Sequence, residues 1–165
     1  MILPGANYLY ALATISMTFV GYARLLLAFR ETGGKTTKYD SYFTLSFMQA
    51  GFIVTAGGLL PQMLAFFDFS EIAVWRVSSA IMAGPVFLFV AATPRRRRLA
   101  VQEPIPVFVR VLLSLQFLAG LCLAANVVGF PREPQVAPFA LAMTAMLFTA
   151  GIAYLIALGR ALRDR

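Results

Sequence analysis

The run "ETGGKTTKYD" at residues 31–40 contains the residue types that can hold a nucleotide phosphate. A Walker loop needs a glycine, four residues and then Gly-Lys-Ser/Thr, placed between a strand and a helix, so that backbone N–H groups surround the phosphates. Counting back from Gly34 and Lys35, the first glycine position is occupied by Phe29, which ends an apolar run. Spacing and context both fail, so we expect no nucleotide ligand.

Catalytic and metal-binding chemistry lacks its usual residues. The sequence has no histidine and a single cysteine, Cys122. General acid–base catalysis and activated nucleophiles need such groups within hydrogen-bond reach of one another. We therefore expect no catalytic residues, no metal and no cofactor. An enzyme would have to use acidic residues at the membrane edges, namely Asp40, Asp68, Glu71 and Glu103.

Composition indicates a membrane protein. The chain has 165 residues, of which 60% are hydrophobic and 13% charged, and its mean hydropathy is +0.78. These values lie outside the soluble range. The net charge of +7 would favour nucleic acid if it formed a solvated basic face on a soluble domain. Here the charges are confined to short segments between apolar runs, so we expect no nucleic-acid partner.

Five apolar runs have the roughly 20 residues that a helix needs to cross a hydrocarbon layer about 30 Å thick. They predict an all-α integral membrane protein, a bundle of five transmembrane helices forming one domain over residues 1–165. Gly33 and Gly34 are typical of a helix end, and the prolines and arginines of residues 93–104 predict a loop. The predicted spans are 8–29, 42–67, 71–92, 105–129 and 136–158.

The basic residues predict the orientation. Lys and Arg of short loops concentrate on the cytoplasmic side of a membrane. With five alternating spans, ten such residues fall on one side and Arg132 alone on the other. We therefore expect the amino terminus outside and the carboxyl terminus in the cytoplasm. The ten residues are Arg30, Lys35, Lys38, Arg95, Arg96, Arg97, Arg98, Arg160, Arg163 and Arg165.

The four consecutive arginines, Arg95, Arg96, Arg97 and Arg98, allow two interpretations. The first is a charge block that keeps the third connection in the cytoplasm. The second is a patch for anionic lipid headgroups, because each basic residue close to such a surface contributes about 1 kcal/mol. The two roles are compatible.

One arginine within a span needs a partner. Arg24 lies near the inner end of the first span, and its side chain leans toward the bilayer centre because helical side chains point toward the helix amino terminus. Asp40, at the start of the second span, is the acidic residue at the same depth. We expect an Arg24–Asp40 contact; the alternative is that Arg24 bends back to the headgroups and Asp40 caps a helix.

A second polar group is predicted at the opposite, outer edge. Gln62, Arg76 and Asn126 fall at similar depths near the ends of three different spans. Polar side chains inside a membrane usually face other helices or a cavity. These three residues form either a structural cluster or a site for a small polar ligand. In the same half of the second span, Gly57, Gly58 and Pro61 are expected to weaken the helix.

The stretch "ATISMTFVGYARLLLAFRETGG", followed by Asp40 and "VWRVSSA", resembles a group of uncharacterised bacterial multi-pass membrane proteins. The resemblance implies a helical bundle in the bacterial inner (cytoplasmic) membrane, and it carries no activity or ligand. Tyr22 and Arg24 depart from the uncharged small or aliphatic residues that it implies there.

The sequence thus leaves two functions open. The leading one is a non-catalytic accessory, scaffold or regulatory component with a basic cytoplasmic face, whose partners are the bilayer, anionic lipid headgroups, and another membrane protein or further copies of this chain. The alternative is a small-solute transporter or channel that acts as an oligomer. A pathway predicts that Gln62, Arg76 and Asn126 face one hydrated cavity, whereas a scaffold predicts that they are tied to each other around a dry centre.

Overall fold

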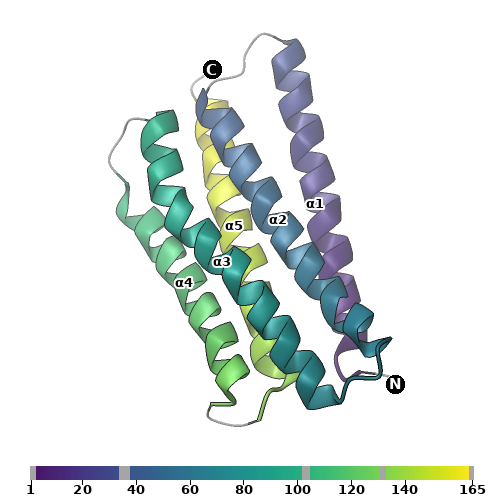
Figure 1. The fold of residues 1–165 in the computed structure, drawn as a ribbon. Helices are drawn as coiled ribbons and strands as arrows, with labels where there is room; N and C mark the ends of the chain where they lie inside the picture. The colour runs from purple at the N-terminus through teal and green to yellow at the C-terminus, as the bar shows by residue number, and fades with distance from the viewer. Residues whose placement is uncertain (1–2, 34–37, 102–104, 131–132, 164–165) are drawn as a thin grey trace.

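A computed structural model describes residues 3–33, 38–101, 105–130 and 133–163 as five long helices (Figure 1). Every regular element in these ranges is an α-helix. The helices run alternately up and down, as short connections require. They are α1 (Ala6–Thr32), α2 (Lys38–Ala65), α3 (Glu71–Val101), α4 (Val107–Val128) and α5 (Val136–Arg163).

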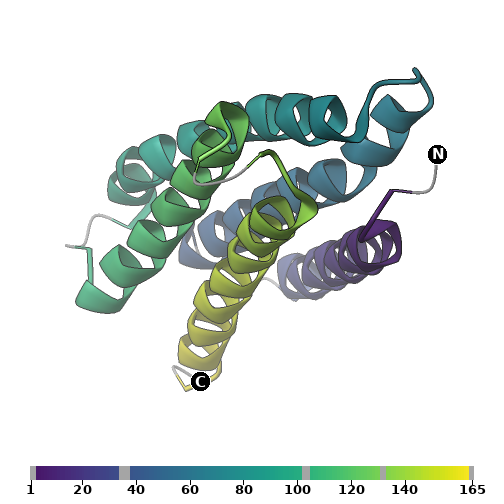
Figure 2. The same ribbon diagram turned by 90° about the horizontal axis from the view of Figure 1, so that it is seen from below.

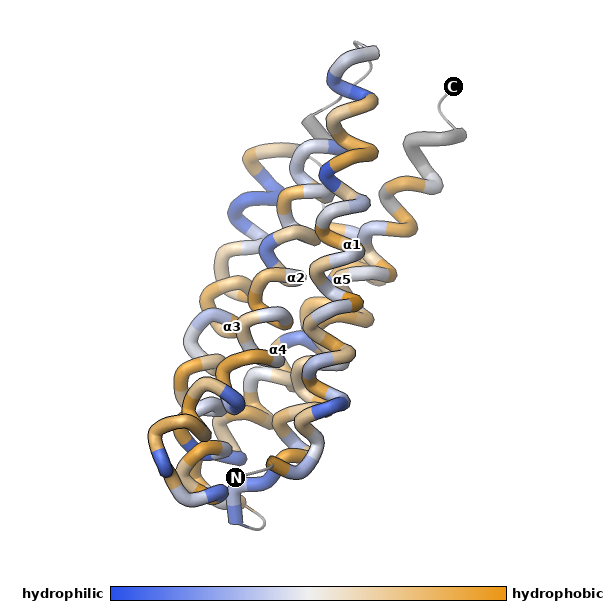
Figure 3. Tube along the Cα trace, turned by 90° about the vertical axis from the view of Figure 1, so that its right-hand side faces the viewer, coloured by the Kyte–Doolittle hydropathy of each residue, from blue (hydrophilic) through white to orange (hydrophobic). Residues whose placement is uncertain are grey.

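All five helices are long and apolar enough to cross a membrane. Large apolar side chains on their outer faces are exposed, among them Leu88, Phe148 and Leu141, with exposed fractions of 65–69%. Such a surface is unusual for a soluble protein and normal in contact with lipid. Most strongly hydrophilic residues lie toward the ends of the bundle (Figure 3). The predicted all-helical architecture is confirmed for the described residues, with five helices that could each span a membrane.

The clearest difference from the predicted boundaries is at the end of α3. The helix does not stop at Ala92 but continues to Val101, through Pro94 and all four arginines. Proline costs one backbone hydrogen bond in a helix, but arginine is a strong helix former. The Thr93 hydroxyl donates to the Phe89 carbonyl at 2.7 Å within the helix. The prediction that residues 93–104 form a loop is therefore wrong for residues 93–101.

Four helices form a ring, and the fifth lies outside it. In the ring α2 contacts α3, α3 contacts α4, α4 contacts α5, and α5 contacts α2. Helix α1 packs mainly on α2, with a small contact to α5, and lies at one side of the bundle (Figure 2). One end of the bundle holds the ends of α1, α3 and α5 and the starts of α2 and α4. We call it the basic end, because Arg95–Arg98 lie there; it is uppermost in Figure 1.

Two glycines of α2 bring α1 close. A Cβ atom on Gly58 would lie 2.7 Å from the Leu9 carbonyl oxygen and 2.9 Å from the Ala13 Cβ. Two turns away, Gly51 approaches Val20, and its carbonyl accepts a hydrogen bond of 2.9 Å from the Ser16 hydroxyl. Small residues permit such close helix approach in membranes. Gly58 therefore serves helix packing, and α2 stays helical through Pro61.

Apolar side chains fill the middle of the ring. Large residues from all four of its helices are at most 3% exposed, as in a protein interior packed at crystal-like density. Toward one end, Trp75 of α3 packs on Phe139 of α5 with ring centroids 5.8 Å apart. The central residues are Val54, Met82, Val86, Leu123, Met143 and Met146.

Candidate functional site

The predicted Arg24–Asp40 contact is wrong, because each residue has a different partner. Asp40 Oδ1 lies 2.7 Å from Arg30 Nη1, and the two side chains are only 8% and 15% exposed. Arg24 Nη1 instead lies 3.3 Å from Glu31 Oε1, in a pair whose side chains are 53% and 46% exposed. Asp40 thus does pair with an arginine of α1 near the basic end. That arginine is Arg30, which the predicted span boundaries place in the loop after the first span.

Helical periodicity explains why Arg30 is the partner. Ala23 and Leu27 are buried, and Arg30 follows them at the i, i+4, i+7 spacing of one helix face. Arg24 is one residue beyond Ala23, which turns its side chain about 100° away from that face. Counting depth alone, without the face, therefore selected the wrong arginine.

The four arginines of the block do not share one environment. Arg95, Arg96 and Arg98 are exposed, and Arg96 donates a short hydrogen bond to the Gln49 amide oxygen of α2. The side chain of Arg97 is 1% exposed. Arg97 therefore differs from the other three members of the predicted charge block or lipid patch, because its side chain is not available at the surface. Phe89, Thr93 and Arg97 are spaced four residues apart, so they share one helix face, and that face lines the interior of the ring.

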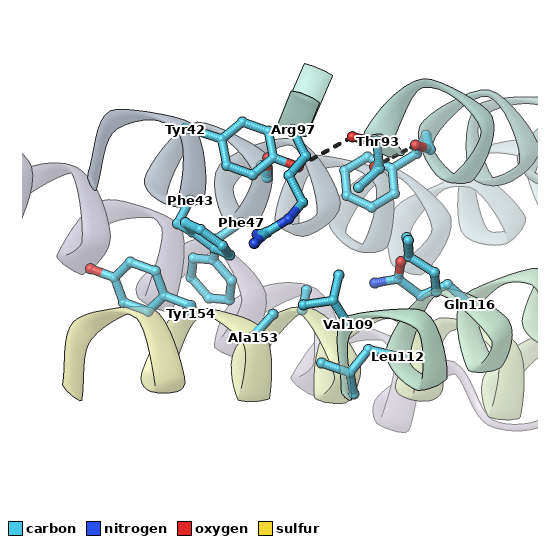
Figure 4. A pocket seen from close by; sticks show the side chains of 14 residues that line it. Tyr42, Phe43, Phe47, Thr93, Arg97, Val109, Leu112, Gln116, Ala153 and Tyr154 are labelled. Atoms are coloured by element: carbon cyan, nitrogen blue, oxygen red, sulfur yellow. Dashed lines mark hydrogen bonds between the residues drawn. The ribbon is translucent and has the colours of Figure 1, made fainter. Parts of the chain in front are cut away.

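Arg97 lies in a pocket between the four helices of the ring (Figure 4). The cavity has a volume of about 50 Å³, which is space for a few water molecules or one small polar group. Aromatic residues form much of its wall, and a smaller number of polar side chains face it. The aromatic residues are Tyr42, Phe43, Phe47, Phe89 and Tyr154, and the polar ones are Ser46, Thr93 and Gln116.

The Arg97 guanidinium has no hydrogen-bond partner in the part of the chain that the structure describes. Its Nε, Nη1 and Nη2 atoms are all buried and unpaired. One face of the group lies over the Phe43 ring, with Cζ 5.6 Å from the ring centroid, which is a cation–π distance. In Figure 4 the side chain extends from α3 into the space between Phe43 and Val109. The pocket thus contains a positive charge whose donors are free.

Contacts between helices hold the pocket walls in place. The Tyr42 hydroxyl donates to the Thr93 carbonyl at 3.4 Å and so joins α2 to α3 (Figure 4). Phe47 of α2 stacks on Tyr154 of α5, with centroids 4.8 Å apart and planes 18° from parallel. Stacked and hydrogen-bonded aromatic walls of this kind are typical of preformed ligand sites.

At the opposite end, Asn126 forms a connected network. Its amide nitrogen donates to the Ser79 hydroxyl at 2.8 Å and to the Gln135 carbonyl at 3.1 Å, while the Gln135 N–H donates to Asn126 Oδ1 at 3.0 Å. The side chain is 2% exposed. Asn126 therefore links α4 to α3 and fixes the chain that enters α5.

The three residues of the predicted outer cluster are not joined to one another. Within the described ranges, Asn126 bonds to Ser79 and Gln135 and not to Gln62 or Arg76. The Gln62 amide nitrogen is buried without a partner, and Arg76 is exposed. Ser79, and neither Gln62 nor Arg76, is therefore the partner of Asn126 on a neighbouring helix.

In the described residues, no group of three or more His, Cys, Asp or Glu side chains could hold a metal ion. Fold and pocket define a class, a multi-pass helical membrane protein with a small cationic pocket among four of its helices. Comparisons with protein-family models, curated proteins and solved structures found no significant match to this chain.

Proposed function

We propose that this chain lies in a bacterial cytoplasmic membrane with its amino terminus outside and its basic end in the cytoplasm. The support is the ten-to-one distribution of Lys and Arg between the two sides, together with five candidate spans. The bilayer, including anionic headgroups near the exposed Arg95, Arg96 and Arg98, is then its immediate partner.

Cysteine labelling in intact cells tests this orientation. In a Cys122→Ser background, Asp68→Cys should react with an impermeant maleimide from outside, and Arg98→Cys should react only after the cells are opened. Both side chains are exposed, so accessibility to the reagent reports the side of the membrane. Labelling of Arg98→Cys in intact cells would reverse the proposed orientation.

Within that membrane, the proposed role is non-catalytic: the chain acts as an accessory or regulatory component that binds another membrane protein or a further copy of itself. The observation that carries this proposal is the apolar filling of the ring between Asn126 and the pocket, where Val54, Met82 and Met143 are 0–3% exposed. A solute pathway through one chain would need polar groups or an open cavity at that level.

Site-directed photocrosslinking in native membranes tests the accessory role. A photoreactive residue is placed at Leu88 of α3 or at Leu141 or Phe148 of α5, which are exposed on the outside of the bundle. The positions on one of these two helices should crosslink one defined protein. The buried position Val86 is the control and should give none. Crosslinks only to lipid at every exposed position, or solute uptake by the reconstituted chain that Arg76→Ala abolishes, would overturn the proposal.

A further inference from the structure

We propose that the pocket around Arg97 binds the carboxylate of an apolar monocarboxylic acid. This inference goes beyond the accessory role and does not depend on it. It rests on the free donors of a buried guanidinium, on the lining of the pocket and on the size of the pocket.

The first observation is the uncompensated charge. A buried charge needs a partner, because its transfer out of water is costly. The Phe43 ring covers one face of the guanidinium, but the nitrogens, which donate in the plane of the group, remain unpaired. That planar fork matches the two oxygens of a carboxylate in a bidentate pair.

Asp40, which lies in a neighbouring cavity, does not supply this partner. Asp40 lines a neighbouring cavity with Arg30, and the Phe43 and Tyr154 rings border both cavities. Its carboxylate is 2.7 Å from Arg30. The two aromatic rings therefore lie between Asp40 and Arg97. Within the described ranges no side chain bonds to the Arg97 nitrogens, so a bound anion has free donors to meet there.

Size and lining select the chemical class. A cavity of about 50 Å³ fits a carboxylate and the start of its chain, whereas a phosphodiester carries two bulky substituents. Along α4 the pocket lining runs from Val109 to Gln116, which is about 10 Å at 1.5 Å per residue. Apolar side chains of α4 and α5, including Leu112 and Ala153, line that part and suit an aliphatic chain.

The pocket lies close to the basic end, since Tyr42 and Val109 belong to the first two turns of α2 and α4. The exposed Arg95, Arg96 and Arg98, which lie on α3 beside Arg97, raise the local concentration of anions near the pocket. The acid therefore has two possible sources with the same recognition chemistry, a fatty acid from the bilayer or a shorter acid from the water phase.

Binding of carboxyl-labelled octanoate tests the proposal. The purified full-length protein is placed in phosphatidylcholine nanodiscs, and equilibrium dialysis is corrected with empty nanodiscs. Saturable binding is expected, with no competition from octanol, chloride or inorganic phosphate. Arg97→Gln should weaken binding about 10- to 100-fold, the range for hydrogen bonds to a charged group. Arg98→Gln, the exposed neighbour, is the matched control and should bind like the wild type.

A second variant covers the case in which Arg97→Gln fails to fold. Ala153→Phe leaves Arg97 in place and fills the cavity, so it should abolish binding while the helical circular dichroism is unchanged. Equal octanoate binding by wild type, Arg97→Gln and Ala153→Phe would overturn the proposal, as would octanol or phosphate competing as well as octanoate.

Two further measurements distinguish a bilayer source of the acid from a water-phase source. If the bilayer supplies it, mass spectrometry of protein extracted in mild detergent should detect a long-chain acid bound to the wild type and absent from Arg97→Gln. If the water phase supplies it, butyrate should compete with labelled octanoate at similar concentrations. Failure of both measurements together with absent octanoate binding would refute the site, whatever the crosslinking shows about the accessory role.

Discussion

The two ends of the bundle each bury a polar side chain almost completely, and they treat it in opposite ways. Asn126 is 2% exposed and Arg97 is 1% exposed. Asn126 makes three hydrogen bonds to Ser79 and Gln135, whereas the three nitrogens of Arg97 have none among the described residues. Burial alone therefore does not separate a structural polar residue from one free to bind a ligand; the state of its donors does.

The largest effect is expected where a buried charge loses its partner. Asp40→Ala removes the carboxylate 2.7 Å from Arg30, whose side chain is 15% exposed. The free energy of unfolding in bicelles should fall by about 3 kcal/mol, because a largely buried ion pair is broken by removal of one partner. A change below about 0.5 kcal/mol, within the range of an exposed pair, would mean that this pair behaves like a surface pair and that pairing at the basic end has little structural weight.

Asn126→Ala should produce the next largest loss, about 2 kcal/mol, since the Gln135 N–H and carbonyl and the Ser79 hydroxyl lose their partner. Ser79→Ala removes one of these bonds and should cost about 1 kcal/mol or less. Unfolding measured by steric trapping gives both values. If Asn126→Ala were neutral, the network at that end would not be the structural counterpart of the Arg97 pocket.

Arg97→Met should have the opposite sign. Replacing a buried, unpaired guanidinium by an apolar chain of similar length should raise the free energy of unfolding by about 1 kcal/mol in protein freed of carboxylic acids. Arg98→Met, at an exposed position, should change it little. A loss of stability in Arg97→Met beyond that of Arg98→Met would show that the arginine supports the fold, and the contrast between the two ends would disappear.

The smallest effect is expected at Arg24. Its pair with Glu31 is about half exposed on both sides, and exposed ion pairs contribute about 0–1 kcal/mol. Arg24→Ala should therefore lower stability by less than about 0.5 kcal/mol in the same unfolding assay. A loss of stability as large as that of Asp40→Ala would mean that the Arg24–Glu31 pair is as important as the buried Arg30–Asp40 pair, in contradiction to its exposure.

The sequence predicts much of the fold because span length and apolar content act locally. All five helices occur where twenty-residue apolar runs predict them. The end of α3 differs, since loop signals at Pro94 and four arginines are outweighed by the helix propensity of arginine and the packing of that turn on the ring. A continuous helix through Pro94 depends on neighbours that no local window contains.

The candidate sites were harder to predict, because they depend on which helix face meets which neighbour. Similar depth favours Arg76 as a neighbour of Asn126, yet Ser79 of the same helix is the residue that bonds to it. Arg97 was grouped with three exposed arginines because adjacent residues look alike in composition. The i, i+4 spacing of Phe89, Thr93 and Arg97 held the missing information, since it aligns Arg97 with a buried face.

The placement of α1 outside the ring also has a dynamic consequence. Helices α3, α4 and α5 each have two substantial neighbours and α2 has three, whereas α1 packs mainly on α2, with close approaches at Gly51 and Gly58. Local opening needs the least free energy where the fewest packed contacts break. Helix α1 is therefore the element that can detach and rejoin while the other four stay assembled, so its motion is separable from that of the ring that encloses Arg97.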